Sequence, residues 1–321
     1  MLTQNASIMR LHLVIVCLIK SSILALNNLE FNPELAKFAL DFAAGAYGDY
    51  PVQCHTKRNS TLIFRYGKRC DVFHNECWAI IGLTDEWITV AFRGTQTKVQ
   101  LIAELLESMT EPKHKIRAGG SVQHYFYVAL DSIWAPINKI TRKLKYLFPN
   151  RKILFTGHSL GGALASLAST VFADHHPKLL KDLYLITFGE PRVGNFEYAQ
   201  AHDRLVPNSW RIVHKYDLVA HIPLCGAIYP RSCSPLFNHA PYHHGIEIWY
   251  QSNMTDTDLF RLCIGNPLNE DDSCSNAWYI HYNVNDHLTY YEHQVSKYGE
   301  NGCVDPSDKS LTQSYESFET D

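Results

Sequence analysis

The sequence predicts an α/β fold, in which a central, mostly parallel sheet is flanked by helices. Strand-like apolar runs at residues 151–156, 183–188 and 211–213 alternate with segments whose apolar residues recur at helical spacing. Strand, helix, strand order is typical of parallel or mixed sheets with helices on their faces. Residues 121–147 keep a helical period throughout, which suits a long amphipathic helix covering one face of the sheet.

The remaining elements fit the same architecture. Residues 33–47 carry apolar side chains at helical spacing after Asn32, a plausible N-cap, and we expect a packing helix there. The β-rich runs 78–83 and 87–92 are separated by a short polar segment, which predicts a hairpin. Pro136 lies inside the long amphipathic segment and is expected to kink it.

The first 26 residues predict a secretory signal peptide. An apolar stretch at residues 11–19 follows Met9 and Arg10 and is too short to span a bilayer comfortably. Lys20 interrupts the stretch, so cleavage is expected between residues 22 and 28; an uncleaved anchor is the alternative. After cleavage we expect no transmembrane segment.

The length of 321 residues suits one catalytic domain, which we expect over residues 27–303. Residues 304–321 are polar and are expected to form a disordered tail. The formal net charge of -3 and the pI near 6.6 provide no basic field for nucleic acid. We find neither a zinc-type Cys/His cluster nor a phosphate-cradling glycine loop, and we expect no nucleic-acid partner.

Cysteine usage and glycosylation signals agree with secretion. Of the nine cysteines, Cys17 lies in the signal peptide, and an even number remains, as is typical of an oxidising compartment. Asn59 and Asn253 each begin an Asn-X-Ser/Thr sequon, which is used only in the secretory route. The remaining cysteines are Cys54, Cys70, Cys77, Cys225, Cys233, Cys263, Cys274 and Cys303.

Gly157-His-Ser-Leu-Gly161 lies between a strand-like and a helix-like run. This is the arrangement of a nucleophile elbow, where glycines permit a turn too tight for neighbours that carry Cβ atoms. The turn presents the serine hydroxyl to a carbonyl substrate. The motif therefore predicts Ser159 as a nucleophile.

A serine hydroxyl is a poor nucleophile at neutral pH, so it needs a histidine base and usually a carboxylate that orients the imidazole. In the chain order of this type of elbow, the acid follows the serine. Asp217 comes just after the predicted strand at residues 211–213 and is the best-placed acid. Asp203 and Asp182 fall in segments expected to be helix or loop, and the side chain of Asp286 should point away from the site.

Position also selects the base among seventeen histidines. His287 lies near the chain end, after the last strand-like stretch, where a loop can bring its imidazole over the elbow. His243 and His244 are the rivals, but they lead directly into the strand-like residues 245–250. For the oxyanion, we expect the amide of Leu160 and the amide and hydroxyl of Thr95 as donors.

Five motifs occur along the chain in a fixed order. They are Phe92-Arg-Gly-Thr95, the elbow with Gly-Ala-Leu-Ala165, Phe188-Gly-Glu-Pro-Arg-Val-Gly-Asn195, Asp217-Leu-Val-Ala-His-Ile-Pro223 and Asp286-His-Leu-Thr-Tyr-Tyr291. With these motifs the chain closely resembles the class 3 (fungal-type) lipases, in particular secreted nematode members, over residues 31–303. The resemblance implies the α/β-hydrolase fold, with Ser159 as nucleophile, Asp217 as acid, His287 as base, and Thr95 with Leu160 as the oxyanion hole. We expect no metal or organic cofactor.

In this family a helical lid follows the first oxyanion residue, and here that segment begins at Gln96. Its apolar residues 102, 105, 106 and 109 share one helical face, although an ordinary core-facing helix would show the same pattern. The family's Val-His-X-Gly-Phe segment is represented by Val122-Gln-His-Tyr-Phe126, so its His and Gly are replaced.

The resemblance also implies disulfides. It pairs Cys263 with Cys274 and Cys54 with Cys303. Cys225 with Cys233 and Cys70 with Cys77 are then assigned by elimination and by their proximity along the chain.

Together these features predict a secreted serine esterase that hydrolyses acylglycerol ester bonds, including those of triacylglycerol, at a lipid–water interface. A phospholipase A1 or a feruloyl-type esterase would use the same triad, because the shape of the acyl pocket decides the substrate. A catalytically silent lipid-binding protein on the same fold is the alternative outside the enzyme class.

Overall fold

The computed structural model describes residues 30–70, 76–95, 114–225, 233–236, 239–265 and 268–304. The chain divides into two compact units, Met1–Pro33 and Glu34–Asp321. The expected signal peptide, the expected lid from Gln96 and all of the expected tail except Val304 lie outside the described residues. The domain boundaries at residues 27 and 303 therefore stay a prediction.

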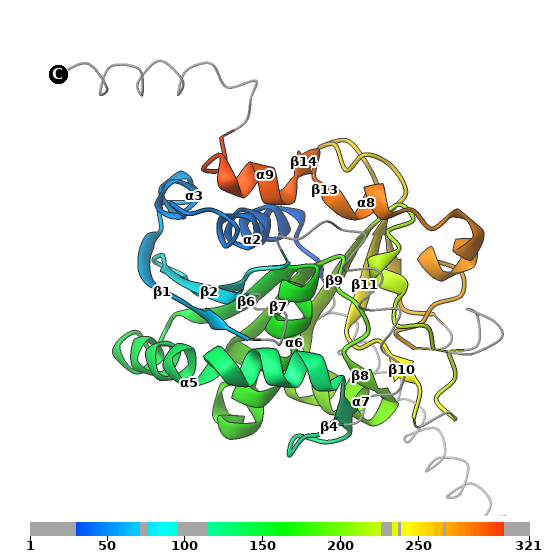
Figure 1. Cartoon of the computed structure of the whole chain (residues 1–321), viewed down its shortest axis with the longest axis horizontal. Helices are drawn as coiled ribbons and strands as arrows, with labels where there is room; N and C mark the ends of the chain where they lie inside the picture. Colours follow the sequence, from blue (N-terminus) through cyan, green and yellow to red (C-terminus); the bar gives the residue numbers. More distant parts are fainter. Residues whose placement is uncertain are drawn as a thin grey trace, which may run out of the picture. The chain divides into compact units, whose positions relative to one another are not determined.

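An eight-stranded sheet forms the centre of the second unit (Figure 1). The neighbours from β3 to β11 pair in parallel, whereas β1 with β2, β2 with β3, and β11 with β12 are antiparallel. The mostly parallel sheet confirms the predicted fold class. The strand order is β1 (Thr61–Arg69), β2 (Glu76–Leu83), β3 (Trp87–Phe92), β6 (Lys152–His158), β7 (Leu183–Phe188), β9 (Asn208–His214), β11 (Ile246–Tyr250) and β12 (Phe260–Cys263).

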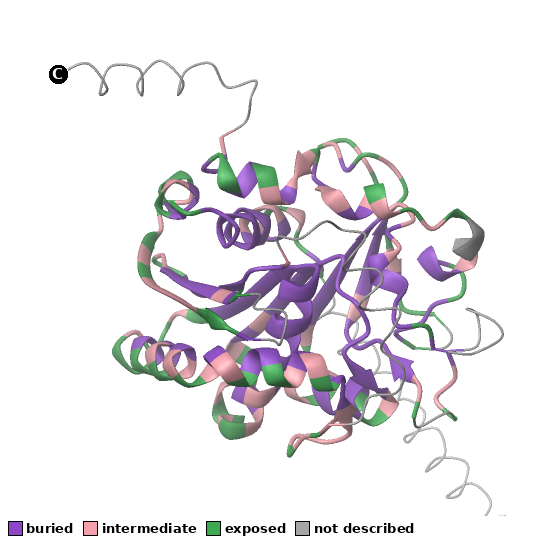
Figure 2. Cartoon of the chain, in the orientation of Figure 1, coloured by how far each residue is buried: buried purple, intermediate pink, exposed green. Residues whose placement is uncertain are grey.

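Helices cover both faces of the sheet because successive strand residues point to opposite sides. Ala79 and Ile81 of β2 belong to the large core cluster that also contains residues of α5 (His124–Leu147) and α6 (Leu160–His175). Ile80, between them, packs in a separate cluster with Phe42 of α2 (Pro33–Gly45). Figure 2 shows that the strands at the centre of the sheet are buried.

Shorter elements complete the described part of the chain. A four-stranded sheet joins β10 (Pro241–Tyr242), β8 (Gly194–Asn195), β5 (Ser121–Val122) and β4 (His114–Lys115), and β13 (Thr289–Tyr290) pairs with β14 (His293–Gln294). The helical segments are α3 (Val52–Lys57), η1 (Pro177–Asp182), α7 (Phe196–Leu205), η2 (Val219–His221), η3 (Ser275–His281), α8 (Val284–Leu288) and α9 (Val295–Glu300). Among the described helices, none has both the length and the apolar character needed to cross a bilayer.

Most element predictions are confirmed, and two differences have simple causes. The predicted helix over 121–147 starts at His124, because Ser121 and Val122 pair with β4 instead. It continues through Pro136 without a break in the helix. The sequence pattern does not predict β1, because the residues of this edge strand are all exposed or only partly buried and lack the apolar alternation that marks a strand.

Four disulfides have the expected pairing. Cys54–Cys303 joins α3 to the segment after α9 and closes a loop with a sequence separation of 249. The other three are local and close separations of 7, 8 and 11 residues; they are Cys70–Cys77, Cys225–Cys233 and Cys263–Cys274. Only the first fastens chain segments that are far apart in the sequence.

Replacing both Cys54 and Cys303 by serine should lower the free energy of unfolding by about 2–5 kcal/mol, because this crosslink restricts the unfolded chain. Replacing Cys70 and Cys77 is the matched control, and it should cost less since the entropy of loop closure grows with loop length. Urea unfolding of the purified double variants gives both values. A larger loss for the Cys70–Cys77 variant would contradict the expectation.

Candidate active site

Ser159 lies in the turn between β6 and α6 with a φ of 61° and a ψ of -131°. A non-glycine residue adopts a positive φ only where the surroundings enforce it. A Cβ atom on Gly157 would lie 2.2 Å from the Gly161 carbonyl oxygen, and one on Gly161 would lie 2.2 Å from the Phe92 carbonyl oxygen. The two glycines therefore let three backbone segments meet at this turn and hold Ser159 in its strained conformation.

Asp217 follows β9, and its carboxylate is buried among hydrogen-bond donors. His287 Nδ1 and the Tyr290 hydroxyl contact Oδ2 at 2.8 and 2.6 Å, and the amides of Val219 and Ala220 donate to Oδ1 at 2.8 and 3.4 Å. Burial by itself raises the pKa of Asp217, but His287 and the hydrogen bonds from His287 and Tyr290 outweigh it and bring the pKa to about 2. The carboxylate is therefore ionised at neutral pH.

His287, on α8, uses Nδ1 for Asp217, which leaves Nε2 for another role. Within the described residues, His287 Nε2 and Ser159 Oγ are both buried and have no hydrogen-bond partner. His158, which precedes Ser159, stacks on the His287 ring with centroids 4.5 Å apart, and its Nε2 donates to the His287 carbonyl oxygen at 2.8 Å. The structure thus places His287 directly beside the elbow.

His158 is itself unsuited to act as the base. Its Nδ1 lies 2.9 Å from the Tyr47 hydroxyl, so both ring nitrogens are engaged. Burial, together with the neighbouring His287, lowers the pKa of His158 to about 3. A neutral, fully bonded imidazole can support the His287 ring by stacking, but it has no free nitrogen with which to take a proton.

Gly189 fills the space between the elbow and the acid. Its φ is 58°, and a Cβ atom on it would lie 2.4 Å from Asp217 Oδ2 and 2.6 Å from His287 Nδ1. One residue earlier, the Phe188 carbonyl oxygen accepts a hydrogen bond from the Ser159 amide at 2.9 Å. The turn after β7 therefore contacts both the nucleophile and the acid–base pair, and only glycine fits at its centre.

The expected oxyanion donors lie at the same edge of the sheet. Phe92 pairs with Gly157 in the parallel register of β3 and β6, so the chain from Phe92 to Thr95 leaves the sheet beside Ser159. Leu160 is the first residue of α6, where backbone amides have no acceptor within the helix. The two segments that should supply the donors are thus adjacent.

Three other carboxylates were considered for the role of the acid, and their positions in the sequence argued against them. Each forms a hydrogen bond with another part of the chain. Asp203 accepts from the Gly245 amide, Asp182 bonds Lys145, and Asp286 accepts from the Tyr216 amide. These contacts agree with the choice of Asp217.

The rival histidines form hydrogen bonds with other residues than Ser159. His243 bonds the Ala220 carbonyl oxygen, and His244 bonds Ser166 and Glu190. Both are buried, as expected for residues that lead into a strand of the sheet.

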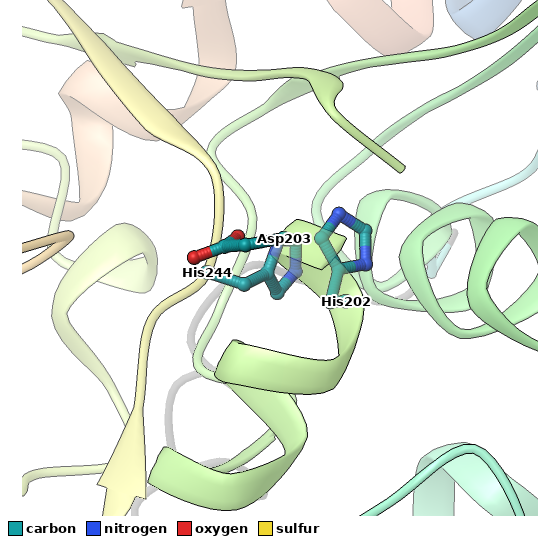
Figure 3. Close-up of side chains that lie close together, drawn as sticks. All are labelled: His202, Asp203 and His244. Atoms are coloured by element: carbon teal, nitrogen blue, oxygen red, sulfur yellow. The ribbon is translucent and has the colours of Figure 1, made fainter. Parts of the chain in front are cut away.

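Two groups of described residues have the composition of a metal site. One consists of His202, Asp203 and His244, which come from α7 and the segment before β11 (Figure 3). Both nitrogens of His202 already contact Thr170 and Ser209, and both oxygens of Asp203 accept hydrogen bonds. The other group is Glu247, Cys263 and Cys274, whose two cysteines form a disulfide. Neither group offers a free set of ligand atoms, so we assign no metal to them.

Three further residues contribute to this site, and the sequence did not predict a role for them: Tyr290, Gly189 and His158. Gly189 and Tyr290 fall within motifs that carry the resemblance, and His158 falls within the elbow motif, but their residue types gave no chemical signal. The glycine directly after the strand-like run 183–188 was the one available hint, because a glycine there permits a positive φ.

The fold and the elbow define an α/β-hydrolase, and comparisons with known proteins define the family. A profile described as lipase (class 3) matches residues 89–227. A Caenorhabditis elegans lipase is 35% identical over 300 residues, covering 87% of this chain and 84% of the relative. The structure of lipase II from Rhizopus niveus superimposes with a TM-score of 0.68 at 25% identity, covering 84% of this chain and 96% of that one.

A shorter match joins 107 residues to a secreted mono- and diacylglycerol lipase of Fusarium solani at 36% identity, covering 33% of this chain and 31% of that protein. The chain belongs to the class 3 lipase family. It is accordingly a carboxylic ester hydrolase of the lipase type.

Gly189→Ala should reduce kcat by roughly 10²-fold, because the methyl group would displace Asp217 and His287 from their contact. Turnover of a soluble short-chain ester measures the loss, and thermal unfolding verifies that the variant is folded. Gly119→Ala is the control, since Gly119 also has a positive φ, of 131°, but borders Ala201 instead of the site. Unchanged turnover in Gly189→Ala would contradict the expectation.

Tyr290→Phe should lower the free energy of unfolding by about 1.5–3 kcal/mol at neutral pH, because a buried hydrogen bond to a charged group is lost. The folded-state pKa of Asp217, about 2, lies below its ordinary value of 3.8. Its stabilisation is therefore present above pH 3.8 and is lost as the pH falls through about 2. Urea unfolding at several pH values should show the variant approaching wild type in acid, whereas a pH-independent difference would contradict this.

Proposed function

We propose that this chain is a secreted serine esterase that hydrolyses acylglycerol ester bonds, including those of triacylglycerol, through an acyl-enzyme. The observation that carries the proposal is the hydrogen-bonded Asp217–His287 pair beside the strained Ser159 turn. Ser159 Oγ and His287 Nε2 are both buried, and neither has a hydrogen-bond partner within the part of the chain that the structure describes. A nucleophile and a base with free reactive atoms are what acyl transfer requires.

In the proposed reaction, Ser159 Oγ attacks the ester carbonyl carbon while His287 Nε2 takes its proton. Asp217 holds the imidazole in the tautomer with the proton on Nδ1 and stabilises the imidazolium that forms. The negative charge on the carbonyl oxygen is stabilised by the amide of Leu160 and by the amide and hydroxyl of Thr95. His287 then returns the proton to the leaving alcohol, and water attacks the acyl-enzyme by the same route to release the fatty acid.

Two observations favour a lipid substrate at an interface. Ser159 and His287 are fully buried, so substrate can reach them only after the site opens. Such opening suits an enzyme that works on an aggregated substrate instead of on dissolved molecules. The Fusarium relative is described as acting on mono- and diacylglycerols, which supports the acylglycerol class. The proposed chemistry uses only side chains and backbone amides, so we propose that no cofactor is needed.

Secretion has separate support. The structure contains four disulfides, which persist in oxidising compartments. The sequon asparagines Asn59 and Asn253 are both exposed and could carry N-linked glycans. The Fusarium relative is described as secreted, and the expected signal peptide agrees with this.

The test compares a long-chain triacylglycerol emulsion with a soluble short-chain ester, each measured across its solubility limit. A rise in rate when the triacylglycerol interface forms supports the proposed lipase. Activity on the soluble ester alone would instead indicate a feruloyl-type or other esterase, and selective release of the sn-1 acyl chain from phospholipid would indicate a phospholipase A1. Inactivity towards every ester would point to a silent lipid-binding protein.

Ser159→Ala should lower the rate on any hydrolysed ester by roughly 10⁴-fold or more, because the acyl-enzyme can no longer form. Ser132→Ala is the control, since the Ser132 hydroxyl donates to the Ala129 carbonyl oxygen within α5. Initial rates of the purified proteins give both values. Activity that persists in Ser159→Ala would contradict the mechanism.

A further inference from the structure

A second buried polar cluster lies close to the candidate site but is not part of it. Glu190 Oε2 accepts a hydrogen bond from the Thr187 hydroxyl at 2.5 Å, and Oε1 lies 2.8 Å from His244 Nε2. The same His244 nitrogen lies 2.6 Å from the hydroxyl of Ser166 on α6, which in turn lies 2.8 Å from the Tyr198 hydroxyl on α7. One carboxyl group thus links β7, α6 and the segment before β11.

This Ser, His and Glu cluster does not have the geometry of a second triad. In a triad the serine and the carboxylate contact opposite nitrogens of the imidazole. Here Ser166 and Glu190 both contact His244 Nε2, and Nδ1 has no partner among the described residues. All three side chains are fully buried.

The cluster is connected to the site through the turn after β7. Glu190 follows Gly189, which borders Asp217 and His287, and Phe188, whose carbonyl oxygen holds the Ser159 amide. The Glu190 side chain points to the opposite side, into the cluster. The Glu190 side chain therefore anchors the turn after β7 from the side opposite to the one that contacts Ser159, Asp217 and His287.

We propose that Glu190 is a positioning residue for the reaction and that its carboxyl group, anchored by Thr187 and His244, holds Gly189 in register with Asp217 and His287. The inference rests on the proposed function. Glu190 contacts neither substrate nor reacting atoms, so its effect passes through the backbone of the turn. A displacement of about 1 Å at a catalytic group is enough to cost roughly 10²-fold in rate.

The protonation state of Glu190 suggests the informative substitution. Burial raises the pKa of Glu190 to about 8, although Thr187, Arg211 and Ser166 oppose this, so the group is mostly a neutral carboxyl at pH 7. Glutamine has nearly the same shape and no charge. It can keep the hydrogen bonds with Thr187 and His244, whereas alanine leaves the turn without its anchor.

The experiment compares kcat and KM for Glu190→Ala and Glu190→Gln on a soluble ester that the wild type hydrolyses. We expect Glu190→Ala to lower kcat at least tenfold with KM within twofold of wild type, and Glu190→Gln to keep kcat within about threefold. Thr187→Val, which keeps the side-chain shape but removes the donor to Glu190, should give an intermediate kcat. If Glu190→Ala does not fold, the kcat of Thr187→Val tests the proposed role of Glu190 instead.

Asp41→Ala is the control for loss of a buried carboxylate. Asp41, on α2, bonds Arg58 and Tyr298 and does not touch the turn, so the variant should lose stability while its kcat stays at the wild-type value. The proposal is overturned if Glu190→Ala keeps the wild-type kcat. If Glu190→Ala does not fold, a wild-type kcat in Thr187→Val overturns it. An equal loss of kcat in Glu190→Ala and Glu190→Gln also overturns it. Failure of the wild type to hydrolyse any ester would instead refute the proposed function.

Discussion

Parallel pairing of the central strands is the constraint on which the rest of the site depends. Because parallel strands share a direction, their carboxyl ends meet at one edge of the sheet, and the chain leaves that edge after each of them. Thr95 follows β3, Ser159 follows β6, Gly189 follows β7 and Asp217 comes soon after β9. The pairing of the strands alone therefore brings Thr95 and Asp217, which lie 122 positions apart in the chain, to the same edge of the sheet.

Burial of this edge creates a second requirement. A carboxylate removed from water is costly unless donors surround it, and Asp217 has two side-chain and two backbone donors. The same arrangement orients His287, because the Nδ1 hydrogen bond leaves Nε2 facing away from the acid. The hydrogen bond between Asp217 and His287 therefore both stabilises the buried charge and orients the proposed base.

The sequence predicted a site residue where a local pattern of neighbouring residues determines its place in the fold. Ser159 was recognisable from glycines on either side and from the apolar runs before and after them, and Asp217 from the strand-like run that it follows. Tyr290 and Glu190 were not recognisable, because what they contribute is contact between segments far apart in the sequence. Tyr290 meets Asp217 across 73 residues, and Glu190 meets His244 across 54. The edge strand β1 was missed for a related reason, since partial exposure removes the apolar period.

If Ser159 is the nucleophile of a triad with His287 and Asp217, a reagent that captures activated serines should label it covalently. The wild-type protein is incubated with a fluorophosphonate ester in the presence of detergent micelles, which offer an interface, and the modified peptide is then located by mass spectrometry. We expect a single phosphonyl adduct on Ser159 that is absent from Ser159→Ala. An adduct on a different serine, or no adduct on a protein that still hydrolyses esters, would contradict it.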